Sequence, residues 1–199
     1  MSNVFLDAIK VRRTIYALGK NIVLPQERIV SLVKDAVKNS PSSFNSQSSR
    51  VVILFAHEHE KLWNIIKETL RKIVPVEAFD ATENKLASFA AGYGTVLFFE
   101  DGDVVDQLQK QFVAYADNFP IWSEHSTGIA QFAVWSTLAQ EHVGASLQHY
   151  NPLIDDEVKR TWNIPASWVL RAELPFGSIE HAAGDKTFIA DEERFRVFS

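Results

Sequence analysis

The eleven residues 40–50 read S-P-S-S-F-N-S-Q-S-S-R and separate two different sequence patterns. Six of the eleven are serine, and this serine loop offers hydroxyls, two side-chain amides and backbone N–H groups together. Such a composition suits either a solvated linker or a loop that hydrogen-bonds a polar, planar or phosphorylated ligand. Apolar residues recur at helical spacing before the loop and form a continuous run after it, so the loop joins helices to a strand.

Two helices are predicted before the serine loop. The second begins behind Pro25 and carries apolar residues at i, i+3, i+4, i+7 and i+8, from Ile29 to Val37. The first has Ser2 as its cap and apolar residues at helical spacing, which are Val4, Ala8, Val11 and Ile15.

After the serine loop, strands alternate with helices. Residues 51–56 form the longest apolar run of the chain, which indicates a buried strand. The next helical pattern spans Leu62 to Ile73 and stops near Pro75. The other elements predicted in this part are a helix with apolar positions from Leu86 to Tyr93, a second buried strand over 95–99, and a helix from Val105 to Phe112.

The C-terminal part adds a long apolar helix and one more strand. Residues 129–138 are apolar on most faces, which predicts a central helix buried on nearly all sides. A polar turn over 148–152 and a short helix over 155–163 follow. Residues 167–174 alternate apolar and polar side chains, as a half-exposed strand does. The fold class is therefore α+β or α/β with few strands.

Composition indicates one globular domain over residues 1–199. Apolar residues make up 46% of the chain, enough for one good core. The formal net charge is -5, and no Lys/Arg cluster interleaves with aromatic residues, so we expect no nucleic-acid partner. The absence of cysteine excludes disulfides, thiolate nucleophiles and Cys-ligated metal centres.

The N-terminal segment does not read as a secretion signal. Asp7 and Lys10 interrupt the apolar region that a signal peptide needs, and the longest apolar run is only six residues. We expect a soluble, cytoplasmic protein without membrane contact.

Residues 185–199 form an apolar tail. Phe188, Ile189, Phe195, Val197 and Phe198 lie among charged residues there. The tail can pack on its own domain, or it can wrap a second subunit in an intertwined dimer.

Several short motifs do not carry the chemistry that they suggest. G-Y-G at 92–94 precedes a strand and lacks a third glycine, so the dinucleotide fingerprint is absent. H-E-H-E at 57–60 places its two histidines on different helix faces, which predicts a solvated helix start and no metal site. Asp155 and Asp156 fit the charged start of a helix. Signatures of hydrolases and phosphotransferases are also absent.

Four dispersed pieces remain, and together they resemble the nitroreductase family of flavin enzymes. The pieces are V-R-R-T-I-Y at 11–16, S-P-S-S-F-N-S-Q at 40–47, G-A-S-L-Q-H-Y-N-P at 144–152, and Phe176-Gly177 followed by Lys186. The segment A-A-G-Y-G-T-V-L-F-F-E-D at 90–101 is similar to the short bacterial and fungal branch called fatty-acid-repression-mutant-type or hydroperoxide-related nitroreductases.

The resemblance implies an α+β sandwich with a small, mainly antiparallel sheet. It also implies an intertwined homodimer, with 185–199 as the wrapping tail and one FMN at each of two subunit interfaces. It places Arg12, Arg13 and Thr14 on phosphate and ribityl oxygens and Lys186 on the phosphate, where guanidinium and ammonium groups suit a dianion. The Arg pair alone also fits an exposed helix end. The family often has a basic residue at the position of Tyr16.

The resemblance further implies a contribution from the partner subunit. It carries flavin contacts onto Ser42, Ser43 and Asn45 of the serine loop, with Gln47 as a neighbour. The resemblance places a second set of contacts elsewhere in the chain. They lie in the turn whose backbone N–H faces flavin N5, where Gln148 is the first candidate donor, and at a residue that faces the pyrimidine side of the ring. The residues of this second set are Gln148, His149, Tyr150 and Lys85.

The function implied is an FMN-dependent oxidoreductase that passes hydride from NAD(P)H through flavin N5 to nitroaromatic, quinone or similar small-molecule acceptors. One open pocket serves both substrates, so ping-pong kinetics are expected. The alternatives are a flavin-binding stress or regulatory protein with incidental reductase activity, and a helical interaction module without cofactor. Four aromatic residues are candidate pocket lids or core residues: Phe44, Tyr115, Phe119 and Trp122.

Overall fold

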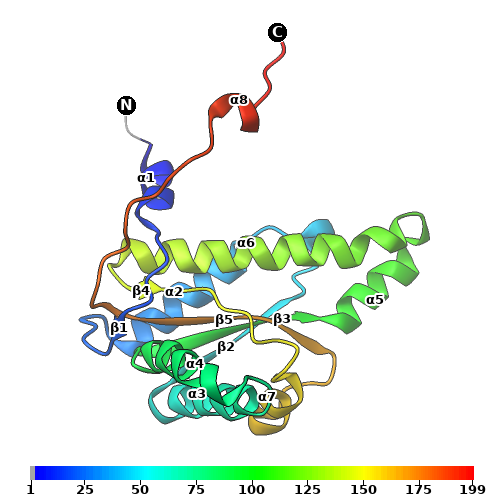
Figure 1. The fold of residues 1–199 in the computed structure, drawn as a ribbon. Coiled ribbons are helices and arrows are strands. Elements are labelled where there is room, and N and C mark those ends of the chain that lie inside the picture. Colours follow the sequence, from blue (N-terminus) through cyan, green and yellow to red (C-terminus); the bar gives the residue numbers. More distant parts are fainter. Residues whose placement is uncertain (1–2) are drawn as a thin grey trace.

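An antiparallel sheet lies between two groups of helices in the computed structural model, which describes residues 3–199 (Figure 1). The strand order is β1-β5-β3-β2, and β4 pairs with β5. Every pairing of these strands is antiparallel, which confirms the predicted α+β class with a small sheet. The strands are β1 (Leu18–Gly19), β2 (Ser49–Phe55), β3 (Gly94–Asp101), β4 (Gly144–Ala145) and β5 (Trp168–Ile179).

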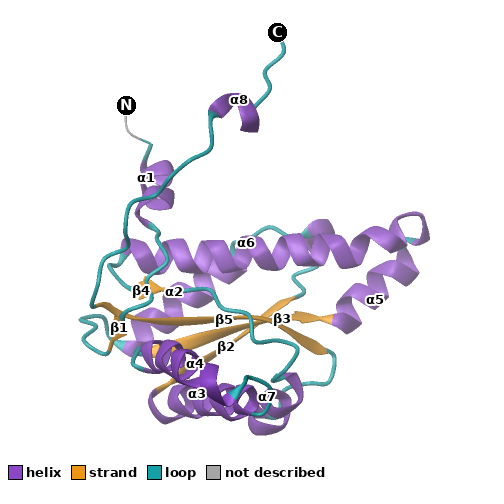
Figure 2. Cartoon of the chain, in the orientation of Figure 1, coloured by secondary structure: helices purple, strands orange, loops and turns teal. Residues whose placement is uncertain are grey.

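Helices cover both faces of the sheet (Figure 2). They are α1 (Val4–Val11), α2 (Gln26–Lys38), α3 (Ala56–Arg71), α4 (Val76–Ala90), α5 (Gly102–Gln111), α6 (Phe119–Gln140), α7 (Asp155–Trp162) and α8 (Asp191–Arg194), with two 3₁₀ turns, η1 (Ser43–Asn45) and η2 (Val113–Asn118). The layer of α3, α4 and α7 packs on one face, and α2 and α6 pack on the other.

Strand alternation divides the apolar residues between two cores. Leu97 and Phe99 of β3 face the α3/α4/α7 layer, and Val96 and Phe98 face α2 and α6. The pairing of β3 with β5 shifts between Phe98 and Phe99, which leaves Arg171 as an extra residue in a β-bulge. Across the bulge, the alternation of β5 side chains between the two faces of the sheet changes phase.

The first helices differ in length from the prediction. Helix α1 ends at Val11, and Ile15 lies beyond it, buried, with its N–H bonded to the Ala145 carbonyl at 3.0 Å. Asn3 caps α1 through its side-chain oxygen, whereas the predicted cap Ser2 lies outside the described residues. The predicted helix from Leu86 belongs to α4, which begins behind Pro75 and ends before Tyr93.

Two predicted strands have different environments from those expected. β5 runs to Ile179 and is mostly buried, because helices cover both faces of the sheet and β1, β3 and β4 border its edges. β2, predicted as buried, is only partly so because it is an edge strand. The two-residue strands β1 and β4 carry too little pattern to predict.

The expectation of a solvated helix start at 57–60 was wrong for His59. This side chain is 1% exposed and is hydrogen-bonded through Nδ1 to Thr95 Oγ1 at 2.8 Å. Trp63 Nε1–H donates to the same hydroxyl at 3.0 Å. Burial lowers the His59 pKa, and bonding to the Ala90 carbonyl opposes that effect. His59 therefore joins α3 to β3 as a core residue.

The terminal segments pack little on the rest of the chain. Val4 and Phe5 of α1 and all residues of 184–199 are exposed, and Figure 1 shows the tail extending away from the sheet. Helix α6 begins at Phe119, before the predicted 129–138, and exposes Ile121 there; within 129–138 only Ile129 is exposed, and the other residues are buried or half-buried. No helix within 3–199 is long and apolar enough to cross a membrane.

Candidate functional site

The chain becomes extended after α1 and places Arg12 against α6. The Arg12 guanidinium lies 4.3 Å from the centre of the Trp135 ring, a cation–π contact. Its Nε is buried and has no hydrogen-bond partner among the described residues. Burial, and then the neighbouring Arg13, lower the pKa of Arg12. A buried N–H without a partner is costly, so this group suits an anionic ligand.

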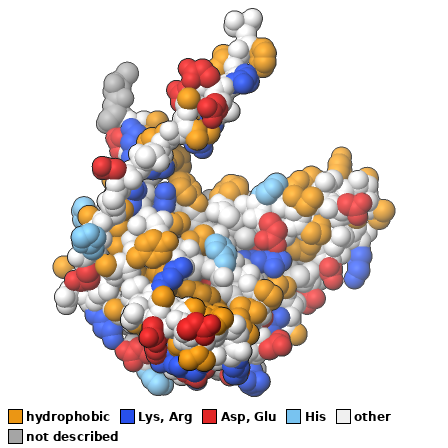
Figure 3. Space-filling model, viewed as in Figure 1, with side chains coloured by type: hydrophobic (Ala, Val, Ile, Leu, Met, Phe, Trp, Pro, Cys, Tyr) orange, Lys and Arg blue, Asp and Glu red, His pale blue; other side chains and the backbone are white. Residues whose placement is uncertain are grey.

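Arg13 joins the first extended segment to the start of the tail. Its Nη2 donates to the Gly184 carbonyl at 2.6 Å. A cavity of about 350 Å³ lies between these segments and is lined by Arg13, Thr14, Tyr16, His181 and Asp185, among others. Figure 3 shows basic side chains near the base of the tail.

Lys186 is the residue after Asp185, which lines this cavity. Its Nζ lies 5.0 Å from the centre of the Phe188 ring in the exposed tail. The structure therefore brings Arg13 and Thr14 to one cavity, with Arg12 next along the chain and Lys186 just beyond the wall. Two guanidinium groups and one ammonium group form a donor set that fits a phosphate.

The turn 148–150 is held by one residue of β5, Glu173. The Gln148 N–H donates to the Glu173 carbonyl at 2.7 Å, and the Glu173 N–H donates to the Gln148 carbonyl at 2.9 Å. The Tyr150 N–H donates to Glu173 Oε2 at 2.9 Å. His149 is exposed, and its N–H has no partner among residues 3–199.

These bonds bear on the expectation that Gln148 donates to a flavin. Its N–H is bonded to Glu173, and its side-chain Nε2 donates to Ser146 Oγ at 2.6 Å. The residue is 8% exposed. Within this turn, the His149 N–H is the one that remains available to a ligand.

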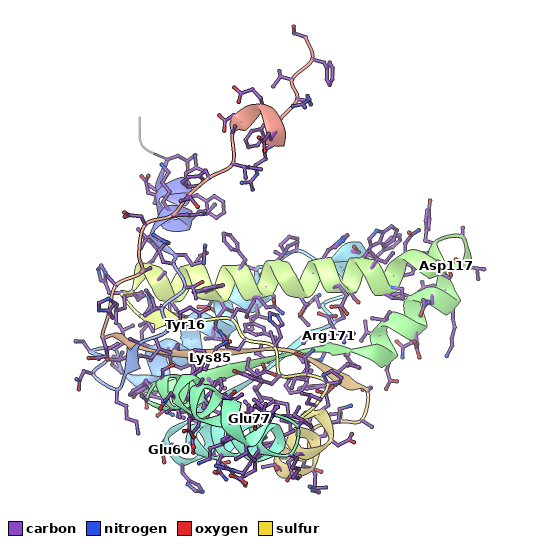
Figure 4. The ribbon with its side chains drawn as sticks, in the orientation of Figure 1. Tyr16, Glu60, Glu77, Lys85, Asp117 and Arg171 are labelled. Atoms are coloured by element: carbon purple, nitrogen blue, oxygen red, sulfur yellow. The ribbon has the colours of Figure 1, made fainter. Side chains whose placement is uncertain are left out.

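Tyr16 and Lys85 both lie near the side-chain ring of Phe89, a residue of α4. The Tyr16 ring centre is 5.8 Å from that of Phe89, and Lys85 Nζ is 6.0 Å from the same ring. Both side chains are exposed, and Figure 4 labels them close together. Burial, then Glu173 and then Tyr16, raise the pKa of Tyr150 to about 12, so Tyr150 stays protonated near this group.

The serine loop is an internally bonded turn. Phe44, Asn45 and Gln47 have φ values of 56°, 51° and 49°, an uncommon conformation for residues other than glycine. Ser42 Oγ accepts from the Gln47 N–H at 2.9 Å. Arg50 donates to the Gln47 carbonyl and pairs with Asp101 at 3.0 Å. Such strain at bonded positions is typical of functional loops.

The structure does not bring the serine loop to the cavity of Arg13 and Thr14, or to Arg12, within one chain. A separate cavity of about 210 Å³ is lined by Ser42, Gln47, Arg50 and Ser126, among others. Ser126 and the Arg12 partner Trp135 are separated by about 14 Å along α6, at 1.5 Å per residue. Arg12 and the serine loop therefore lie at different positions along α6.

The four candidate lid residues form one aromatic cluster together with Phe112. Phe44 stacks on Trp122 with ring centres 6.2 Å apart and lies 4.7 Å from Phe112. Phe119 is 2% exposed and belongs to the core, whereas Phe44 and Tyr115 are about half exposed. Only the exposed members can act as a lid.

Sequence reasoning missed Glu173. The alternation over 167–174 placed it on the polar face of a half-exposed strand, yet it is 0% exposed. Its position against the turn depends on the long-range pairing of β5 with 148–150, which local sequence does not signal.

The chain is similar to known proteins along most of its length. The profile described as "Nitroreductase family" matches residues 9–178. The nitroreductase FRM2 of Saccharomyces cerevisiae is 33% identical over 189 residues, which covers 93% of each chain.

Solved structures with the same fold include the nitroreductase CinD of Lactococcus lactis. Its complex with nicotinic acid is 50% identical and has a TM-score of 0.91, with 98% of this chain and 100% of that chain covered. Its complex with 4-nitrophenol is 49% identical with a TM-score of 0.90 and the same coverage.

Proposed function

The chain belongs to the nitroreductase family, and from this premise we propose that it is an FMN-dependent oxidoreductase that uses NAD(P)H to reduce nitroaromatic, quinone or similar acceptors. Bound FMN would supply the redox chemistry, taking two electrons from reduced nicotinamide and giving them to the acceptor. The observation that carries the proposal is the cavity lined by Arg13 and Thr14, whose wall residue Tyr16 lies near Tyr150 of a turn that offers one available N–H.

In this proposal, the phosphate of FMN is bound by Arg12, Arg13 and Lys186. The buried Arg12 Nε without a partner supports this assignment, because a phosphate oxygen would accept from it. Thr14 lines the same cavity and can bond ribityl oxygens.

The ring of FMN is oriented by the turn 148–150 and by Lys85. We assign the N5 donor to the His149 N–H, because the neighbouring N–H groups are bonded to Glu173. Lys85 is an exposed cation near Tyr16 and can stabilise negative charge on the pyrimidine side.

The proposed enzyme is a homodimer. Ser42, Ser43, Asn45 and Gln47 complete the flavin site of the partner subunit, since the serine loop does not line the cavity of Arg13 and Thr14 in its own chain. The exposed apolar residues of α1, α6 and 185–199 supply an interface of the obligate kind.

The nitroaromatic substrate class is supported by the complex of the Lactococcus lactis relative with 4-nitrophenol. Exposed Phe44 and Tyr115 can cover a planar acceptor in the partner's site.

Anaerobic steady-state kinetics test the proposal. Purified protein should be yellow and should oxidise NAD(P)H with nitro or quinone acceptors, and double-reciprocal plots should be parallel because one pocket serves both substrates. Sequential kinetics would refute the shared pocket. Background rates with every acceptor would instead favour a flavin-binding regulatory protein, and colourless protein that binds no FMN would refute both.

A further inference from the structure

One residue, Glu173, satisfies the N–H groups on both sides of His149. Its main chain exchanges two hydrogen bonds with Gln148, at 2.7 and 2.9 Å, and its carboxyl accepts from Tyr150 at 2.9 Å. The turn is thus bonded before and after His149, and the His149 N–H itself has no partner among residues 3–199. Both the backbone and the side chain of Glu173 contribute to this arrangement.

The Glu173 carboxyl has no cationic partner among the described residues. Asp155 of α7 is a nearby acid, and Tyr150 of the turn is a neutral phenol. Arg171, two residues away on β5, pairs with Glu124 of α6 at 2.6 Å. Burial raises the pKa of Asp155. Lys159 and Arg171 oppose this effect, and Asp156 adds to it. A second phenol, Tyr16, lies near Tyr150.

The protonated carboxyl fits this setting better than the carboxylate. Glu173 is 0% exposed, and its Oε1 has no hydrogen-bond partner within residues 3–199. A buried carboxylate without a cation is far more costly than a buried neutral acid. Burial, with a smaller effect of Asp155, raises the pKa of Glu173 to about 8, although the Tyr150 N–H opposes this.

We propose that Glu173 is a positioning residue that holds the 148–150 turn as the uncharged acid, and that loss of its proton at alkaline pH disfavours the reduced state of the bound flavin. This inference rests on the proposed flavin site. A negative charge buried behind the turn would repel a ring system that gains electrons, whereas the neutral acid holds the turn without adding charge.

The protonation state of Glu173 can be measured directly in the full-length protein as purified. Carbon-13 NMR of the Glu173 carboxyl, assigned through its own side-chain carbons, should show a titration near pH 8. A Glu173 signal that titrates below pH 6 would show a carboxylate at neutral pH and would overturn the inference. This measurement needs no variant.

The effect on the flavin is tested with Glu173→Gln, which preserves the acceptor for Tyr150 and removes the titration. The midpoint potential of bound FMN is measured from pH 6.5 to 9.5. Wild-type potential should fall more steeply above about pH 8, and this inflection should be absent in Glu173→Gln.

Glu100→Gln is the matched control. Glu100 is 2% exposed, burial raises its pKa, and it accepts from Ser49 at 2.5 Å instead of from the turn. Its potential profile should match that of the wild type. An inflection that persists in Glu173→Gln, or that disappears in both variants, would overturn the assignment to Glu173.

The two proposals fail in different ways. Protein that binds no FMN would refute the proposed function, while the NMR titration would still report on Glu173. Protein that binds and reduces FMN, with the same potential profile in wild type and Glu173→Gln, would refute only the role of Glu173.

Discussion

The 148–150 turn and the terminal segments differ in how far a single chain buries and hydrogen-bonds them. The turn is bonded to a fully buried residue of β5 within one chain. By contrast, residues 184–199 are exposed throughout, although they include Phe188, Phe195 and Phe198. The ring-facing part of the proposed site is thus built by a single chain, whereas the phosphate-facing part includes a tail that this chain does not bury.

This difference separates folding from assembly. Both faces of the sheet are covered by helices of the same chain, which form the two cores. Exposed apolar area on α1 and the tail gains stability only when another surface covers it. Loss of the tail should therefore affect assembly and cofactor binding more than the fold of the sheet.

The largest effect is expected from deleting the residues after Gly184. The truncated chain should lose both the dimer and FMN, because the wrapping segment and Lys186 are removed. Its far-ultraviolet circular dichroism should still show the helices and sheet. A truncated protein that remains dimeric by light scattering and yellow by absorbance would show that the tail does not wrap the partner.

His149→Pro addresses the turn itself. Proline removes the one available backbone N–H, so stopped-flow reduction by NAD(P)H should slow by about 10² to 10³-fold, as for loss of one charge-stabilising donor. His149→Ala keeps the N–H and should reduce at nearly the wild-type rate. Comparable rates in flavin-loaded His149→Pro and His149→Ala would remove His149 as the donor.

Arg12→Ala and Lys186→Ala compare the two regions within the phosphate site. Each should weaken FMN binding by about 1.5 to 3 kcal/mol, the range for hydrogen bonds to charged groups. Riboflavin lacks the phosphate and should bind wild type and both variants about equally poorly. Arg28→Ala, which removes an ion pair with Glu141 on the surface, is the control. Unchanged FMN affinity in both test variants, measured by fluorescence titration, would exclude these residues from the site.

The sequence predicted the helices and the long strands where periodic apolar patterns are continuous. Val51 to Phe55 and Thr95 to Phe99 are strands, and Asp155 and Asp156 begin α7 as expected. The boundaries of these elements did not follow from the pattern, because tertiary pairing decides them. Ile15 continues the helical spacing of α1, yet its N–H pairs with Ala145, a residue 130 positions away.

The candidate site was predictable where residue type alone indicates chemistry. Arg12, Arg13 and Lys186 are cations suited to a phosphate, and the serine loop is rich in hydrogen-bonding groups. The sequence could not predict which N–H groups of the turn already have a hydrogen-bond partner, because this depends on the pairing of the turn with β5. Gln148 and His149 look equivalent in sequence, but pairing with Glu173 uses the N–H of Gln148 and not that of His149.

The smallest change between neighbouring measurements concerns the stability that the buried Glu173 contributes. In flavin-free protein, the raised pKa of Glu173 means that the folded state binds a proton more tightly than the unfolded state, whose pKa is near 4.5. This contribution is fully present below that value and is lost as pH rises toward about 8. The free energy of unfolding of wild type, relative to Glu173→Gln, should fall by up to about 1.4 kcal/mol per pH unit between these values. Urea unfolding at pH 5.5, 6.5 and 7.5 measures the difference. Glu77→Gln, at an exposed residue at the start of α4 (Figure 4), is the surface control measured at the same three pH values. A constant difference for Glu173→Gln would show that Glu173 is already ionised in the folded protein at pH 5.5.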